Sequence, residues 1–188
     1  MRMERIRSFI SIDVEEGAVL DKIIRIQEDL KGTGAIFKPV ERQNIHLTIR
    51  FLGEIPMKTI ELVKEIMSKI EFSRFKLELR GIGAFPSSSR PRVIWIGVGD
   101  GGENVIQIYE RIEKELRRIG FPKEREKFVP HVTIARVKRY TPALIKYLRD
   151  HRDIEVGSID VNSIRLKKST LTSRGPIYEV LFEVHATG

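Results

Sequence analysis

Two short segments of the 188-residue chain share one pattern of histidine, apolar residue, threonine and isoleucine. They read HLTIRF from His46 and HVTIAR from His131, so the two histidines are 85 positions apart. If each segment is a β-strand, its side chains alternate between two faces, and each histidine shares a face with its threonine, Thr48 or Thr133. Each segment therefore predicts an imidazole and a hydroxyl side by side on an apolar backing.

Two such pairs brought together suit the opening of a phosphodiester by water. That reaction needs a base to take a proton from water and an acid to protonate the leaving oxygen, on opposite sides of the phosphorus. Imidazole titrates near neutral pH, so one ring can be neutral while the other is protonated. Threonine hydroxyls can donate to phosphate oxygens, and a guanidinium can offset transition-state charge. This chemistry needs no metal or cofactor, and the sequence shows no obvious carboxylate cluster to hold one.

The strands and helices that position these segments are predicted in a similar order in each half of the chain. Apolar residues at alternating or continuous spacing predict strands, and apolar residues at helical spacing predict helices. The predicted strands span residues 7–14, 46–52, 75–79, 93–98, 131–137 and 158–166, with a last strand around 178–184. The predicted helices span residues 16–31, 56–70 and 103–119, with a short one from 141. In the strand at 158–166 the apolar phase slips between Val161 and Ile164, which predicts a β-bulge.

Corresponding landmarks in the two halves share nearly one offset, which indicates an internal repeat. Ile10 and Trp95 differ by 85 positions, His46 and His131 by 85, and Leu77 and Val161 by 84. We therefore predict an α+β fold of two pseudo-symmetric lobes, each a largely antiparallel sheet with helices on its outer face, around a central cleft. Residues 1–188 would form a single two-lobed domain built by duplication, and the Gly-, Pro- and Ser-rich residues 81–91 would cross between the lobes.

Composition excludes several classes of protein. The 34 Lys and Arg against 26 Asp and Glu give a net charge of +8, which favours a polyanionic partner such as nucleic acid over a merely solvated basic surface. The absence of cysteine excludes a disulfide scaffold and a thiol nucleophile. No apolar run approaches the roughly 18 residues of a membrane span, and the first residues lack a secretory signal pattern. We therefore expect a cytoplasmic protein with no membrane partner.

The paired motifs resemble the two-histidine phosphoesterase superfamily with its duplicated HxTx signature. Within it, the sequence is most similar to the RNA 2',3'-cyclic phosphodiesterases, formerly described as 2'-5' RNA ligases. The opening RSFISI at residues 7–12 resembles the first strand of that family, and residues 169–181, with Gly175-Pro176 and Tyr178, resemble its last hairpin. The resemblance implies hydrolysis of a terminal 2',3'-cyclic phosphate on RNA to a 2'-phosphate, without metal or cofactor.

The resemblance also implies a role for each site residue. His46 would be the proton donor to the leaving 3' oxygen, and His131 the proton acceptor that activates water. Thr48 and Thr133 would hold phosphate oxygens, and Arg136 would contact the phosphate or the terminal base. Strict alternation puts Arg136 on the core face of its strand, so this role requires the strand to twist or end there. Arg50 shares the parity of His46 and is the alternative cation at the cleft.

Three functions remain open on the sequence alone. The first is hydrolysis, and the second is the reverse reaction, which joins the cyclic phosphate to a 5'-hydroxyl in a 2'-5' bond. The third is a non-catalytic module that binds RNA ends, against which the completeness of both motifs argues. The expected partner is RNA with a 2',3'-cyclic phosphate end, such as a tRNA fragment, with a small cyclic nucleotide as the alternative. The protein is expected to act as a monomer.

Overall fold

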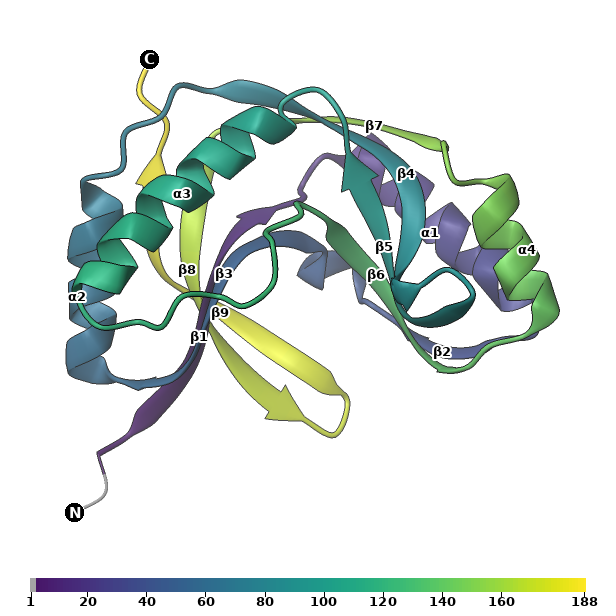
Figure 1. The fold of residues 1–188 in the computed structure, drawn as a ribbon, viewed down its shortest axis with the longest axis horizontal. Coiled ribbons are helices and arrows are strands. Elements are labelled where there is room, and N and C mark those ends of the chain that lie inside the picture. The colour runs from purple at the N-terminus through teal and green to yellow at the C-terminus, as the bar shows by residue number, and fades with distance from the viewer. Residues whose placement is uncertain (1–2) are drawn as a thin grey trace.

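The structure is a computed structural model that describes residues 3–188. Helices and strands alternate along the chain, as the periodicity predicts (Figure 1). In chain order they are β1 (Arg5–Asp13), α1 (Gly17–Gly32), β2 (Ile36–Pro39), the 3-10 helix η1 (Arg42–Asn44), β3 (His46–Pro56), α2 (Met57–Ser68), β4 (Phe75–Ser87), β5 (Arg90–Val98), α3 (Gly102–Arg118), β6 (Val132–Arg139), α4 (Pro142–Asp150), β7 (Glu155–Val161), β8 (Ser163–Thr172) and β9 (Gly175–His185).

The strands form one nine-stranded sheet in the order β7-β4-β5-β6-β3-β1-β8-β9, with β2 paired to β6. Every strand pair in it is antiparallel. At its centre, β3 and β6 meet only at Leu47 and Val132, which divides the sheet into two lobes. The first lobe holds β3, β1, β8 and β9, and the second holds β6, β2, β5, β4 and β7. Figure 1 shows α2 and α3 outside the first lobe and α1 and α4 outside the second. The predicted α+β class and its two lobes are confirmed.

Each lobe contains elements from both halves of the chain. Strand β4 comes from the first half but pairs with β5 and β7 in the second lobe. Strands β8 and β9 come from the second half but complete the first lobe beside β1. The helices follow the same exchange, since α1 packs against β7 and β6 while α3 packs against α2 and β3. Neither half of the sequence therefore corresponds to one lobe.

Two predictions about where the chain crosses between lobes were wrong. Residues 81–91 do not cross but form the β4–β5 hairpin of the second lobe, with Phe85 opposite Val93. The strand expected at 158–166 is two strands, because β7 ends at Val161 and β8 begins at Ser163 in the other lobe. The slip in apolar phase is therefore a crossing at the exposed Asn162 and not a bulge.

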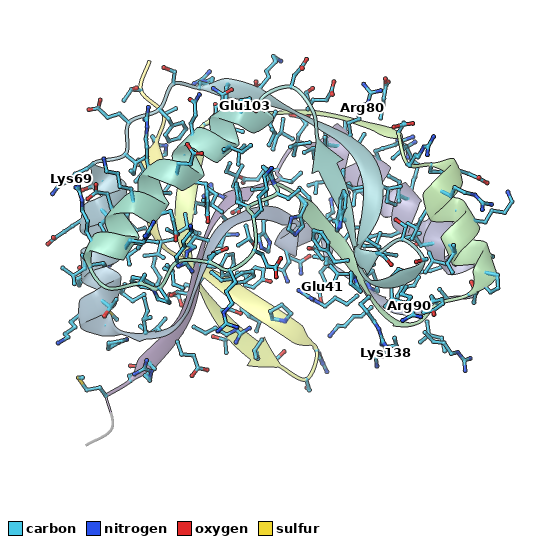
Figure 2. All side chains as sticks on the ribbon, viewed as in Figure 1. Glu41, Lys69, Arg80, Arg90, Glu103 and Lys138 are labelled. Atoms are coloured by element: carbon cyan, nitrogen blue, oxygen red, sulfur yellow. The ribbon has the colours of Figure 1, made fainter. Side chains whose placement is uncertain are left out.

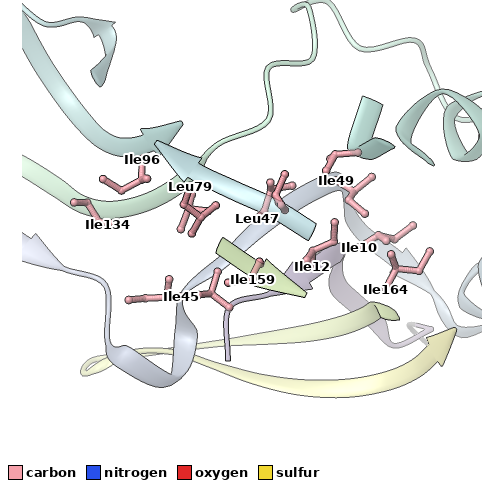
Figure 3. Close-up of a cluster of buried hydrophobic side chains, with 14 of the residues drawn as sticks. Ile10, Ile12, Ile45, Leu47, Ile49, Leu79, Ile96, Ile134, Ile159 and Ile164 are labelled. Carbon is pink, nitrogen blue, oxygen red and sulfur yellow. The ribbon is translucent and has the colours of Figure 1, made fainter. Parts of the chain in front are cut away.

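A contiguous apolar core lies between the sheet and the helices, and it backs the motif strands. Figure 3 shows Leu47 and Ile49 of β3 close to Ile10 and Ile12 of β1, with Ile134 of β6 farther along the same cluster. All five side chains are at most 2% exposed. Burying each such side chain contributes about 1.5–3 kcal/mol relative to leaving it in water. The backbone that carries the histidines is therefore rigidly supported from behind.

Charged side chains surround this core on the outer surface, as Lys69, Arg80 and Lys138 illustrate in Figure 2. In the part of the chain that the structure describes, no helix is long and apolar enough to cross a membrane.

Candidate active site

The two motif segments meet at the junction of the lobes. His46 begins β3 and His131 directly precedes β6, each one residue before the residues that pair at the junction. Both histidines and both motif threonines are half-buried. Continued by one residue in either direction, the antiparallel register sets His46 toward Thr133 and Thr48 toward His131. The structure thus brings together the four motif residues that the sequence singled out.

The two imidazole rings are held in the same way. Nδ1 of His46 lies 2.7 Å from the carbonyl oxygen of Asn44, and Nδ1 of His131 lies 2.7 Å from that of Val129. A carbonyl can only accept, so Nδ1 carries the hydrogen in both rings and donates it. Each Nε2 is then the atom available for proton exchange, and Nε2 of His46 lies 3.0 Å from Thr48 Oγ1.

A β-bulge occurs at the same position of both motifs. In the β1–β3 ladder Ser11 pairs with Thr48 and Ile10 with Arg50, which leaves Ile49 as the extra residue. In the β5–β6 ladder Trp95 pairs with Thr133 and Ile94 with Ala135, which leaves Ile134 as the extra residue. Because a bulge adds one residue, it moves every later side chain of the strand to the opposite face.

The bulges reverse what strict alternation predicts for the two arginines. Arg136 is exposed and, by this register, lies on the same face of β6 as His131 and Thr133. Arg50 is instead 7% exposed on the core side. The alternative of Arg50 as a cation in the site was therefore wrong.

On the other side of the sheet, Arg50 forms ion pairs and a hydrogen bond with residues of α3 and of the loop that follows it. Its Nε lies 2.8 Å from Glu113 Oε2 and 3.1 Å from Glu124 Oε1. Its Nη2 donates to the carbonyl of Pro122 at 2.8 Å. Since Pro122 and Glu124 belong to the loop that leads into the second motif, Arg50 ties the first motif strand to that loop. The position that matches Arg136 in the first motif is held by Phe51, which is 57% exposed and offers an aromatic face suited to stacking on a base.

His46 lies in an aromatic and charged environment. Its ring centroid lies 5.0 Å from that of Phe9 and 5.4 Å from that of Tyr178. Burial lowers the pKa of His46 to about 4, and the positive charges of Lys167 and Arg136 act in the same direction. The hydrogen bond to the Asn44 carbonyl and the charge of Asp13 oppose this lowering of the pKa. Without substrate, His46 is therefore neutral at neutral pH.

His131 lies beside a different pair of aromatic rings. Its ring lies edge-on to Phe85 at 5.0 Å and 6.2 Å from the ring of Trp95. The sequence identified the two histidines as equivalent but missed this difference in surroundings. Tyr178 and Lys167 come from the exchanged strands β9 and β8, and no local pattern in the sequence shows that these strands adjoin the first motif.

Other features of the surface lie away from the histidines. Two surface depressions run beside α3, lined in part by Glu113 and Arg111, and neither includes a motif residue. Within residues 3–188 no group of three or more His, Cys, Asp and Glu side chains is arranged to hold a metal ion.

Comparison with known proteins agrees with the resemblance read from the motifs. The family described as LigT like Phosphoesterase matches residues 13–95 and again residues 96–178. An RNA 2',3'-cyclic phosphodiesterase of Aeropyrum pernix is 46% identical over 170 residues, which cover 89% of this chain and 97% of the relative. One of Methanocaldococcus jannaschii is 41% identical over 182 residues, covering 94% and 99% of the two chains.

Solved structures show the same fold. A crystal structure from Thermus thermophilus matches with a TM-score of 0.81 at 25% identity, covering 96% of this chain and 97% of that one. The crystal structure of E. coli LigT complexed with 3'-AMP matches with a TM-score of 0.80 at 24% identity, covering 98% of this chain and 100% of that one. The overall fold is thus shared with these structures.

Proposed function

The chain belongs to the LigT-like phosphoesterase family, and from this membership we propose that it hydrolyses the 2',3'-cyclic phosphate at the end of an RNA to a 2'-phosphate. The observation that carries the proposal is the meeting of the two motif strands at Leu47 and Val132, with Nδ1 of each histidine bonded to a carbonyl. Relatives at 46% and 41% identity, named RNA 2',3'-cyclic phosphodiesterases, support it.

In the proposed reaction, His131 Nε2 takes a proton from water as the water oxygen attacks phosphorus. The bond from phosphorus to the 3' oxygen breaks, and His46 Nε2 gives its proton to that oxygen. The products are a 2'-phosphate and a free 3'-hydroxyl, and each step uses only side chains of this chain. The proposed reaction requires neither a metal ion nor a cofactor.

The surrounding groups support these steps by charge and hydrogen bonding. Thr48 and Thr133 donate to the non-bridging phosphate oxygens, and the guanidinium of Arg136 offsets the charge that builds on them. Although the pKa of His46 is about 4 in the free site, the negative charge of a bound phosphodiester favours the imidazolium. Substrate binding therefore prepares His46 to act as the acid.

Because both histidines belong to one chain, we propose that the monomer is sufficient for activity. RNA fragments such as those of cut tRNA would serve as substrates. We also infer that the single domain of residues 1–188 arose by internal duplication, which the bulges at Ile49 and Ile134 support since both fall at the fourth motif position.

The first experiment uses an end-labelled RNA with a 2',3'-cyclic phosphate in the presence of EDTA. We expect the wild type to form the 2'-phosphate and His46→Ala and His131→Ala each to lose most activity, with non-additive losses in the double variant. His151→Ala is the matched control, because His151 stacks on Tyr147 away from the motifs. Near-normal turnover by either motif variant, or a strict need for added Mg²⁺, would refute the mechanism.

A substrate with a good leaving group separates the acid from the base. An aryl phosphodiester that releases 4-nitrophenolate needs little protonation of the leaving oxygen. We expect His46→Ala to lose far less activity on this substrate than on the cyclic phosphate, whereas His131→Ala loses activity on both. The opposite result would exchange the two roles.

The reverse reaction, 2'-5' ligation, is the second candidate, because microscopic reversibility lets the same site perform it. Adding an RNA with a 5'-hydroxyl end to the same assay and looking for a 2'-5' joined product tests it. Salt-sensitive binding of the RNA end without turnover would instead favour a non-catalytic binding module.

A further inference from the structure

A carboxylate stands directly beside one of the two histidines but does not bond to it. Asp13 is paired with His46 in the β1–β3 ladder, so the two side chains lie on one face at neighbouring positions. The carboxylate is occupied elsewhere. Its Oδ1 accepts from Ser11 Oγ at 2.9 Å and lies 2.5 Å from Lys167 Nζ, and its Oδ2 accepts from Arg165 Nη1 at 2.8 Å.

Lys167 is the unusual member of this group, because it is a lysine only 5% exposed. Its Nζ lies 5.9 Å from the ring centroid of Phe9 and 5.4 Å from that of Tyr178, the two rings that contact His46. Asp13 is the carboxylate with which Lys167 forms an ion pair. Because the Lys167 and Asp13 side chains are only 6% and 12% exposed, their charges are weakly screened and act strongly on the nearby imidazole.

Arg165 is the second cation of Asp13, but it is shared with other carboxylates. Arg165 also binds Glu15 at 3.0 Å and forms an ion pair with Glu183. The cluster thus holds two cations and three carboxylates, a formal charge of −1. Without Lys167 the formal charge beside His46 would be −2.

The second motif lacks this arrangement. Trp95 pairs with Thr133 as Ser11 pairs with Thr48, so by the same register Gly97 stands where Asp13 stands. Glycine has no carboxylate, and the ring neighbours of His131 are Phe85 and Trp95. The second motif therefore has no counterpart of the Asp13–Lys167 pair.

We propose that Asp13 and Lys167 are a positioning pair for His46, in which Lys167 holds the Asp13 carboxylate and prevents it from becoming a permanent counter-ion of the imidazolium. His46 then releases and regains its proton in each turnover. This inference depends on the proposed function only for the turnover measurements, since the titration of His46 does not require activity. The charged and titratable groups that face His46 include Asp13 from β1, Lys167 from β8, Tyr178 from β9 and Arg136 from β6, and His131 lies across the junction of the lobes.

The test is an NMR titration of the histidine rings in the full chain, with the His46 signal assigned from its absence in His46→Asn. In Lys167→Met we expect the pKa of His46 to rise by about 1 unit or more, because Asp13 loses one of its two cations and the positive charge of Lys167 near His46 is removed. Lys167→Arg should keep the wild-type value. Adding Asp13→Asn to Lys167→Met should abolish the rise.

Turnover gives a second readout. The acid limb of the kcat/KM profile should move to higher pH in Lys167→Met and return in the double variant. Glu113→Gln, which alters the remote buried ion pair with Arg50, is the control for loss of a buried carboxylate and should leave the His46 titration unchanged. If Lys167→Met does not fold, Lys167→Gln is measured in its place. The double variant Asp13→Asn with Lys167→Met is also measured, because it removes both charges of the pair and leaves neither buried alone.

The inference is wrong if the pKa of His46 stays constant in Lys167→Met, or if the rise persists when Asp13→Asn is added. A wild type that fails to hydrolyse the cyclic phosphate would refute the proposed function. The titration would still decide whether the pair controls His46, so the two failures are distinguishable.

Discussion

At the scale of single residues, the two histidines make the same hydrogen bond to a backbone carbonyl, but the two carbonyls differ in how firmly they are held. Each Nδ1 donates to the carbonyl two residues earlier, at Asn44 or Val129. The side chain of Asn44 is buried and donates to the carbonyl of Pro176 at 3.1 Å, whereas Val129 is 46% exposed. His46 is therefore tied to the β8–β9 hairpin, while His131 depends on a loop.

Removing this tie should affect the first histidine specifically. We expect Asn44→Ala to lower kcat for the cyclic phosphate by about tenfold, equivalent to roughly 1.4 kcal/mol, because the carbonyl that orients His46 loses its anchor. Val129→Ala is the matched control and should change kcat less than about twofold. Steady-state kinetics of both variants provide the check, and equal losses would contradict this account.

The lowered pKa of His46 also predicts how stability depends on pH. Between pH 4 and 6.5 the unfolded chain protonates this histidine while the folded protein does not, so stability falls as the pH drops through that window. Wild type should lose about 1–2 kcal/mol more than His46→Asn between pH 7 and pH 5. Urea unfolding at the two pH values measures this difference, and parallel losses would show that burial of His46 carries no such cost.

At the scale of elements, the bulges decide which arginine reaches the site. Both motif segments look like plain alternating strands, and by alternation Arg50 faces the site while Arg136 faces the core. The extra residues Ile49 and Ile134 reverse this assignment. The bulges do leave a trace in the sequence, because the large buried apolar residues pass from Ile49 to Leu52 and from Ile134 to Val137, a spacing of three and not two. The pairing of each strand with its neighbour is what identifies this slip as a bulge.

The same truncation should therefore have opposite consequences at the two arginines. Arg136→Ala should lower kcat/KM for the cyclic phosphate by about 10–100-fold with little change in stability, since its side chain is exposed. Arg50→Ala should cost about 3–5 kcal/mol of stability, because it leaves Glu113 buried without its cation. Kinetics and urea unfolding of both variants test the contrast. A stability loss at Arg136, or none at Arg50, would contradict it.

Much of the fold and site follows from local sequence, and the rest depends on long-range pairing. The repeat of His46 and Thr48 at His131 and Thr133 predicts the motif strands because alternation and spacing are local. The break at Asn162 was interpreted as a bulge because a phase slip looks the same whether a strand kinks or changes lobe. Lys167 could not be identified either, since its place beside the first motif depends on the pairing of β8 with β1.

At the scale of the whole molecule, the exchange of strands between lobes makes them interdependent. The first lobe needs β8 and β9, and the second needs β4 and α1 from the other half of the chain. Neither lobe can bury its apolar face with residues of one half alone.

We therefore expect one cooperative unfolding transition for the whole chain. Fluorescence of Trp95, the only tryptophan, reports on the second lobe, and far-UV circular dichroism reports on both lobes. Their urea midpoints should coincide, and fragments 1–98 and 99–188 should each lack stable structure when separate. Distinct midpoints, or a fragment that unfolds cooperatively by itself, would show independent lobes.

The late position of β8 and β9 also matters while the protein is being made. Strands β1 and β3 emerge from the ribosome early, but their sheet is completed only by residues 163–185. A nascent chain therefore carries one edge of β1 unpaired through most of translation, and an exposed edge is a template for pairing with other chains. We therefore expect chaperones to bind this protein mainly while it is still on the ribosome. Chaperone binding should end once the finished chain is released and β8 has paired with β1.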